Sequence, residues 1–272
     1  MSNNSYQAKK RFGQNFLVDG NSIHRIIRAV NPQIGEHLLE IGPGLGALTT
    51  HLVDSGCQLD VVEIDRDLAA TLNNTYIGKP NFQLHLIDAL KVDYAAFVKD
   101  KQKLRVIGNL PYNISTPLLF HLLAYKTFIH DMHFMLQKEV VDRLASPEGH
   151  KTYGRLSVMV QYHCHVEPLF VVAPSAFRPA PKVESAIVRL RPKERATPVS
   201  DPVFFAQIVN NCFQQRRKTL RNGLKIILKE LPADCLSEID LGRRPETFSV
   251  EEFIRLANHL SKYRNTSRTS KH

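Results

Sequence analysis

Short apolar runs alternate with helical patterns from His37 onward, and this alternation restricts the possible folds more than any other feature of the chain. His37–Ile41, Leu59–Ile64 and Phe82–Ile87 are expected to be buried strands, and Val106–Gly108 and Met132–Leu136 continue the series. The helical segments that separate or follow them are Leu45–Asp54, Arg66–Asn74, Ser115–Ala124 and Lys138–Leu144. Such alternation over short connections predicts an α/β fold with a doubly wound, mostly parallel sheet.

The pattern changes after the last predicted strand, Ile187–Leu190. The charged, proline-bearing segment Arg191–Pro202 is typical of a linker, and everything beyond it has helical periodicity. The helical segments there are Val203–Phe213, Thr219–Glu230, Leu236–Ile239 and Val250–Leu260. We therefore predict a domain of residues 1–195 that holds the sheet and a small all-helical domain of residues 196–272.

The first predicted strand runs into a glycine turn, Gly42-Pro43-Gly44-Leu45-Gly46. Glycines let the backbone turn tightly and approach a ligand closely. The G-x-G-x-G spacing differs from the dinucleotide fingerprint, and Pro43 lacks an N–H that a pyrophosphate would use. A cofactor without phosphates therefore fits better than NAD, and a turn that binds nothing is the alternative.

Two acidic residues stand at the ends of the next strands. Glu63 lies about twenty residues beyond the glycine turn, where a carboxylate can accept hydrogen bonds from ribose hydroxyls. Asp88, at the end of the third strand, is placed to accept from an adenine amino group. Together with Gly42 and Gly44 they predict a nucleoside-containing cofactor at this edge of the sheet.

The tetrapeptide Asn109-Leu110-Pro111-Tyr112 follows the fourth strand. These residue types would suit methyl transfer to an exocyclic amino group such as adenine N6. That nitrogen is a poor nucleophile because its lone pair is delocalised into the ring. Acceptors for its two hydrogens, the Asn109 side-chain oxygen and the Leu110 carbonyl, would favour the pyramidal, reactive nitrogen. Pro111 stiffens the turn, and Tyr112 offers a flat face for a base. Taken alone, the four residues could equally be a turn that closes a strand.

Net charge points to a polyanionic partner. Lys and Arg number 36 against 26 Asp and Glu, which gives +10 and a pI near 9.5. Nucleic acid is favoured over a membrane, since tryptophan is absent and no cationic helix has an apolar, aromatic face. The candidate phosphate contacts are Arg216, Arg217, Lys218 and Arg221, although charge runs are often only solvated faces.

Other features argue against metals and membranes. The four cysteines form no C-x-x-C pair, and His163-Cys164-His165 has no further ligand beside it, so no metal site is predicted. No apolar run approaches the ~20 residues that span a bilayer, and the first ten residues are polar. We expect a cytoplasmic protein and, without an obvious dimerisation helix, a monomer.

The sequence resembles the ribosomal RNA adenine dimethyltransferases, specifically the bacterial family that acts on small-subunit (16S) rRNA. The resemblance runs from Lys10 to about Arg191 and resumes at Gln215–Asn222. The blocks that carry it are Arg11–Leu17, Glu40–Gly46, Gly108–Pro117, Phe134–Val141, Pro174–Phe177 and Pro181–Ser185.

This resemblance implies S-adenosylmethionine as cofactor and two successive methylations on each of two adjacent adenines in a hairpin loop near the rRNA 3′ end. The substrate would be 16S rRNA in a pre-subunit particle during ribosome biogenesis. Asn15 and Leu17 would close over the methionine side of the cofactor, and Gly42, Glu63, Asp88 and Asn109 would complete its site. Phe177 would stack on the target adenine opposite Tyr112, with a phenylalanine buried in the core as the alternative.

Three rival hypotheses differ in class. One is the related enzymes that methylate large-subunit rRNA and confer macrolide resistance. Another is an assembly factor that binds RNA without needing catalysis. The third is an NAD oxidoreductase, which would be protected from unfolding by NAD.

Overall fold

The computed structural model describes residues 14–98, 102–215, 217–229, 231 and 239–269. They form two compact units. The sheet unit comprises the chain up to Val141 and His165–Pro192, and the helical unit comprises Asp142–Cys164 and the chain from Lys193 onward. This grouping differs from the predicted division at residue 195, because helix α6 (Arg155–His163) packs with later helices.

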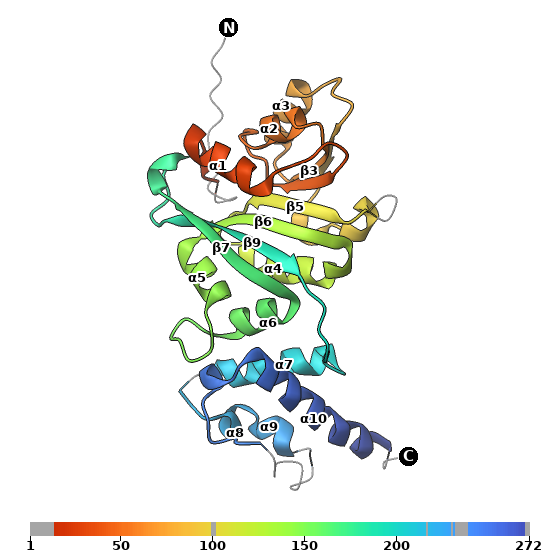
Figure 1. Cartoon of the computed structure of the whole chain (residues 1–272), viewed down its shortest axis with the longest axis vertical. Helices are drawn as coiled ribbons and strands as arrows, with labels where there is room; N and C mark the ends of the chain where they lie inside the picture. The colour runs from red at the N-terminus through yellow and green to blue at the C-terminus, as the bar shows by residue number, and fades with distance from the viewer. Residues whose placement is uncertain (1–13, 99–101, 216, 230, 232–238, 270–272) are drawn as a thin grey trace. The chain divides into compact units, whose positions relative to one another are not determined.

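A seven-stranded sheet organises the sheet unit, with strand order β4-β3-β2-β5-β6-β9-β7 (Figure 1). Neighbours from β4 to β6 pair in parallel, whereas β6 and β9 are antiparallel. The strands are β2 (His37–Ile41), β3 (Gln58–Glu63), β4 (Phe82–Leu86), β5 (Leu104–Asn109), β6 (Ile129–Gln137), β7 (Cys164–Val172) and β9 (Ser185–Pro192). The chain moves outward from β2 to β4 and then returns to β5 on the other side of β2. The predicted doubly wound sheet is therefore confirmed.

Helices connect these strands. In chain order they are α1 (Gly20–Val30), α2 (Thr49–Asp54), α3 (Arg66–Thr75), α4 (Ser115–Ala124) and α5 (Lys138–Ala145). Short 3-10 turns are η2 (Ala89–Lys91), η3 (Tyr94–Phe97), η4 (Lys126–Phe128) and η5 (Pro174–Ala176). Asp19 and Asp65 begin α1 and α3 by accepting from backbone N–H groups within the first turn, those of Ser22 and Asp67 respectively. The predicted helix Leu45–Asp54 starts late, because the glycine turn extends to Leu48.

A two-stranded ribbon lies outside the main sheet. β1 (Phe16–Leu17) pairs antiparallel with β8 (Phe177–Arg178), so that Leu17 faces Phe177. The Val18 N–H extends the pairing with a 2.8 Å hydrogen bond to the Ala176 carbonyl. These strands are too short for periodicity to reveal them. They join two segments that are far apart in the sequence.

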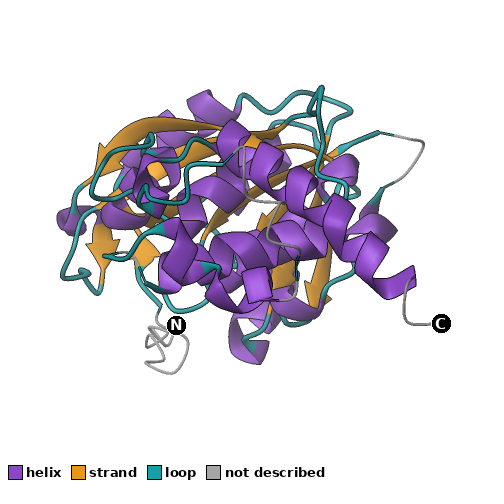
Figure 2. Ribbon diagram, turned by 90° about the horizontal axis from the view of Figure 1, so that it is seen from below, coloured by secondary structure: helices purple, strands orange, loops and turns teal. Residues whose placement is uncertain are grey.

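The helical unit contains α6, α7 (Pro202–Gln214), α8 (Leu220–Gly223), α9 (Lys225–Lys229), η7 (Pro245–Thr247) and α10 (Val250–Thr269), which Figure 2 distinguishes from the strands. The predicted continuous helix Thr219–Glu230 is wrong, because the helix is interrupted at Leu224, between α8 and α9. Gly223 allows α8 to approach α7, since a Cβ there would lie 3.0 Å from the Cys212 Cα. The predicted segment Leu236–Ile239 lies almost wholly outside the described residues, and the predicted linker begins inside β9.

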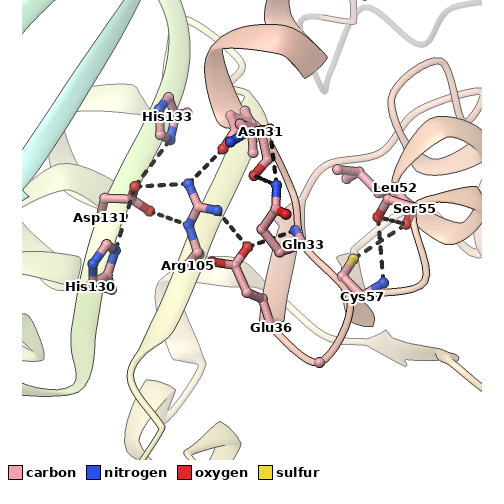
Figure 3. A network of polar contacts seen from close by, with 12 residues as sticks. Asn31, Gln33, Glu36, Leu52, Ser55, Cys57, Arg105, His130, Asp131 and His133 are labelled. Carbon is pink, nitrogen blue, oxygen red and sulfur yellow. Dashed lines mark hydrogen bonds and ion pairs between the residues drawn. The ribbon is translucent and has the colours of Figure 1, made fainter.

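Arg105, the second residue of β5, anchors the end of α1 to the sheet (Figure 3). Its guanidinium donates to both carboxylate oxygens of Asp131 at 2.9 and 3.0 Å, to Glu36 at 2.7 Å and to the Val30 carbonyl at 2.7 Å. Burial alone would raise the pKa of Asp131, but the hydrogen bonds from Arg105 together with the charges of Arg105, His133 and His130 hold that pKa below its usual value. Within the described residues, no helix is long and apolar enough to cross a membrane.

Candidate active site

The carboxyl ends of β2 and β5 form the natural ligand crevice of this sheet. The strands are neighbours, but the chain leaves them toward opposite sides, which makes this the topological switch point where open α/β sheets bind ligands. Gly108 keeps the two strands close, because a Cβ there would lie 2.6 Å from the Ile41 carbonyl oxygen. Gly42 and Asn109 consequently stand side by side at the strand ends, where a Cβ on Gly42 would be 3.9 Å from the Asn109 carbonyl oxygen.

A cavity of about 290 Å³ opens at this edge, near the lower end of the volumes of small-molecule sites. It is lined by the segment before α1, the glycine turn, the ends of β3 and β4, and the tetrapeptide after β5. The lining includes every predicted cofactor residue, namely Asn15, Leu17, Gly42, Gly44, Glu63, Asp88 and Asn109, together with Leu110, Pro111 and Tyr112. Segments spread over about a hundred residues therefore meet at one cavity.

The glycine turn depends on left-handed backbone. Gly42, Gly44 and Gly46 have φ of 65°, 60° and 87°, a region that side chains with a Cβ rarely adopt. At Gly44 a Cβ would also meet the Phe16 ring at 3.0 Å. The G-x-G-x-G spacing is thus explained by conformation at each glycine, and the turn lets the N-terminal segment lie against the loop.

Two carboxylates fit a nucleoside. Oε1 of Glu63 accepts from the backbone N–H groups of Ile64 and Asp65, both at 2.8 Å, and the residue lines the cavity. Burial raises the pKa of Glu63, against the lowering effect of backbone hydrogen bonds from Asp65, Ile64 and Gly44. Oδ1 of Asp88 caps η2 by accepting from the Leu90 N–H at 3.0 Å, which leaves Oδ2 as an acceptor for a ligand.

Beside these carboxylates the cavity has an apolar part. Ile64 and Ile87 both line it and are 48% and 39% exposed. Such surface suits a flat, uncharged ring. Acceptors for hydroxyl and amino groups next to an apolar slot match the ribose and adenine of S-adenosylmethionine.

Asn109 is held in one orientation. Its Nδ2 donates to the Asn15 carbonyl oxygen at 3.0 Å, and because a carbonyl can only accept, the amide nitrogen must face Asn15. Oδ1 therefore remains an acceptor. The next residue, Leu110, donates its N–H to Met135 on β6 at 3.2 Å, and no residue that the structure describes donates to the Leu110 carbonyl. Two acceptors thus stand at the end of β5.

The rest of the tetrapeptide is also fixed. The Pro111 carbonyl accepts from the Ile114 N–H at 3.1 Å, and Ser115 Oγ donates to the Tyr112 carbonyl at 3.1 Å. The Tyr112 hydroxyl is hydrogen-bonded to Ser185 Oγ at 2.8 Å. Tyr112 is half-buried and lines the same cavity as Asn109 and Leu110.

Phe177 lies elsewhere. Its side chain is 1% exposed and belongs to the core cluster that contains Leu17, Ala176 and Ile187. The residues that line the cavity do not include it. Stacking of Phe177 on an adenine stays a prediction, and it requires the ring to leave this core.

The predicted phosphate contacts are in the helical unit. Arg217, Lys218 and Arg221 are exposed, whereas Arg216 lies outside the described residues. Arg217 and Lys218 precede α8, and only Arg221 is within it. Elsewhere in the described part of the chain, no three or more His, Cys, Asp and Glu side chains are grouped as a metal site requires.

Glu40 is a residue that the sequence-based site omitted. It is 2% exposed in β2, lines the cavity and accepts from Thr49 Oγ1 at 2.7 Å. Burial, with a smaller contribution from the nearby Glu63, raises its pKa to about 7 against the lowering effect of the Thr49 hydrogen bond. One signal was available, namely an acidic residue within the otherwise apolar run Leu38–Ile41.

Comparison with known proteins decides the family. The model for the family described as ribosomal RNA adenine dimethylase matches residues 5–262. The chain belongs to this family. It is therefore an S-adenosylmethionine-dependent rRNA adenine dimethyltransferase with a Rossmann-like fold and a helical C-terminal region, which excludes the NAD oxidoreductase.

Relatives with a common name match this chain over nearly its whole length. It is 55% identical to the ribosomal RNA small subunit methyltransferase A of Pseudomonas aeruginosa, over 94% of this chain and 96% of that protein. The protein of the same name from Pseudomonas syringae pv. syringae is 56% identical, with the same coverage.

Two solved structures also resemble it. A dimethyladenosine transferase from Plasmodium falciparum has a TM-score of 0.77 at 26% identity, covering 93% of this chain and 98% of that one. The 23S rRNA methyltransferase ErmE has a TM-score of 0.67 at 26% identity, covering 91% and 100%.

Proposed function

We propose that the enzyme dimethylates N6 of two adjacent adenines in a hairpin loop near the 3′ end of 16S rRNA, within a pre-subunit particle during ribosome biogenesis. Support for the small subunit comes from relatives that are 53–56% identical and bear the small-subunit name. Support for chemistry at an amino nitrogen comes from one observation above all. The Asn15 carbonyl turns the Asn109 amide so that its oxygen is kept as an acceptor beside the Leu110 carbonyl.

These two acceptors would bind the two hydrogens of the target amino group. Their hydrogen bonds hold the nitrogen pyramidal, so that its lone pair is directed away from the ring system rather than into it. This is electrostatic preorganisation, and no strong base is needed to begin the reaction. S-adenosylmethionine supplies an electrophilic methyl group on its sulfonium. Fixing the amino group in line with that methyl provides much of the remaining acceleration.

The same pair of acceptors suits two successive transfers. In each transfer the new N–CH3 bond would form as the sulfonium C–S bond breaks, S-adenosylhomocysteine would leave, and one N6 proton would pass to solvent. After the first, N6 keeps one hydrogen, from which either Asn109 Oδ1 or the Leu110 carbonyl can still accept a hydrogen bond. After the second, no N–H remains and both hydrogen bonds are lost. The dimethylated base is therefore held more weakly than either substrate, which favours its release.

Residue roles in cofactor binding follow from the cavity. Glu63 would accept from the ribose hydroxyls, and Asp88 Oδ2 from the adenine amino group, with Ile64 and Ile87 against the ring. Asn15 and Leu17 would cover the methionine side. The turn at Gly42 and Gly44 allows backbone to approach the cofactor closely.

RNA recognition would use both units. Tyr112, on the cavity wall, would stack on the extruded adenine, as base chemistry requires a base taken out of its stack. Arg216, Arg217, Lys218 and Arg221 would contact phosphates, in keeping with the net charge of +10. We further propose that the enzyme acts as a monomer in the cytoplasm, where its ribosomal substrate is assembled.

Incubation with labelled S-adenosylmethionine and immature, unmethylated small subunits tests the proposal. We expect label in N6,N6-dimethyladenosine from the 3′ hairpin of 16S rRNA. If label appears instead only when large-subunit RNA is supplied, the small-subunit target is wrong.

The assembly-factor hypothesis makes a separate prediction. Asn109→Ala should slow transfer by about 100- to 1,000-fold while subunit binding persists. Rescue of growth by this variant would show that binding, rather than methylation, is the main role in the cell.

A further inference from the structure

Ser185 occupies a rigid position behind the tetrapeptide. It is the first residue of β9, is fully buried, and pairs with Gln137 at the carboxyl end of β6. The preceding residue, Glu184, accepts from the Lys138 N–H at 2.9 Å, which continues the β6–β9 pairing beyond the strands. The Ser185 side chain is therefore carried by the sheet itself.

Tyr112 contacts this position through its hydroxyl. The 2.8 Å hydrogen bond to Ser185 Oγ fixes the far end of the phenol, while Ser115 Oγ fixes the backbone at the Tyr112 carbonyl. A tyrosine side chain has two rotatable bonds, and because its oxygen lies on the long axis of the ring, this hydrogen bond restrains χ1 and so the direction in which the ring projects. The position of the ring is thus restrained by residues of α4 and β9, outside the tetrapeptide.

We propose that Ser185 is a positioning residue that fixes the Tyr112 ring as the surface on which the target adenine stacks. This inference rests on the proposed stacking role of Tyr112. Stacking tolerates many bases because it depends on the face of the ring, so the position of the ring affects where N6 lies relative to the two acceptors. Ser185 acts through Tyr112 and touches neither the adenine nor the cofactor.

A double-mutant cycle tests the proposal. Ser185→Ala and Tyr112→Phe each remove one partner of the same hydrogen bond, so each should lower kcat/KM by roughly 3- to 10-fold. The double variant should be no slower than either single variant, because the interaction can be lost only once. Ser185→Thr, which keeps the hydroxyl, should restore most of the rate.

A second readout separates positioning from simple loss of stability. RNA with 2-aminopurine at the target position becomes brighter when the base is unstacked, and the chain has no tryptophan to interfere. Bound to Ser185→Ala this RNA should be brighter than bound to the native enzyme. The matched control is Ser157→Ala, which removes another fully buried serine hydroxyl, hydrogen-bonded to the Arg143 carbonyl in the helical unit. It should lower thermal stability without changing fluorescence or kcat/KM.

The outcomes are distinguishable. If Tyr112→Ala transfers methyl groups at the native rate, the stacking role of Tyr112 fails and the inference fails with it. If Tyr112→Ala is impaired but the effects of Ser185→Ala and Tyr112→Phe add in the double variant, only the role of Ser185 is overturned. Unchanged 2-aminopurine fluorescence in Ser185→Ala would also overturn it.

Discussion

Glu40 should make the stability of the enzyme fall as pH rises through the weakly acidic range. Its carboxyl is buried at the cavity and its pKa is raised from 4.5 to about 7, chiefly by burial. In the folded state Glu40 therefore keeps a proton that the unfolded chain releases. Unfolding then releases a proton between these two pH values, so increasing pH favours the unfolded state there.

The magnitude follows from the two pKa values. Each tenfold change in proton affinity is worth about 1.4 kcal/mol, so the group contributes about 3 kcal/mol of pH-dependent destabilisation. Below pH 4.5 both states are protonated and this contribution vanishes, whereas above pH 7 it is complete. Glu40→Gln removes the titration while preserving the size of the side chain.

Urea denaturation of the native enzyme and Glu40→Gln from pH 4 to 8 would measure the contribution of Glu40 to the free energy of unfolding. The difference in free energy of unfolding between them should change by about 3 kcal/mol across that range, in favour of the glutamine variant at higher pH. Thr49→Val removes the hydrogen bond that favours the ionised carboxylate, so it should extend the change to higher pH. Parallel pH profiles for native enzyme and Glu40→Gln would refute the reasoning.

Three further predictions concern other parts of the sheet unit. Arg105→Ala should lower the free energy of unfolding by about 3–5 kcal/mol, measured by urea denaturation, because it leaves Asp131 buried without its partner. Gly108→Ala should reduce both thermal stability and methyl transfer, since its Cβ would clash with the Ile41 carbonyl and displace the adjoining Asn109; a native rate would contradict this. Tyr112→Ala and Phe177→Ala should each raise the activation free energy of methyl transfer by about 1–3 kcal/mol, because a stacking surface is lost. Phe177→Ala should in addition destabilise the fold by about 3–5 kcal/mol, because the ring is buried, and equal stability of the two variants in thermal unfolding would argue against that packing.

The parallel sheet was predictable because its strands carry strong signals. β2 and the part of β6 from Met132 to Leu136 are mainly apolar and buried throughout, as central strands covered on both faces are. Their order follows from the rules of doubly wound folds, and those rules also place Glu63, Asp88 and Asn109 at one edge. The cavity therefore contains the cofactor residues and tetrapeptide that the sequence indicated.

Features that depend on long-range packing could not be predicted in the same way. β1 and β8 have two residues each, and their pairing is specified by the surrounding core rather than by local pattern. Phe177 was expected to stack on the target adenine, with burial in the core as the alternative, and its ring lies in the core where β8 pairs with β1. The break between α8 and α9 follows from close packing of Gly223 on α7, which helical periodicity does not reveal. Glu40 could be added to the site only once the structure showed that its side chain lines the cavity.

The central claim is that Asn109 Oδ1 and the Leu110 carbonyl present an adenine amino group for two successive methylations. Mass spectrometry of digested 16S rRNA, after single-turnover reaction of unmethylated small subunits with native enzyme and with Asn109→Ala, tests it most directly. The account predicts N6,N6-dimethyladenosine at two adjacent adenines with the native enzyme, and a rate about 100- to 1,000-fold lower with the variant. Equal rates for the two proteins, or a modified base other than N6-methylated adenine, would contradict it.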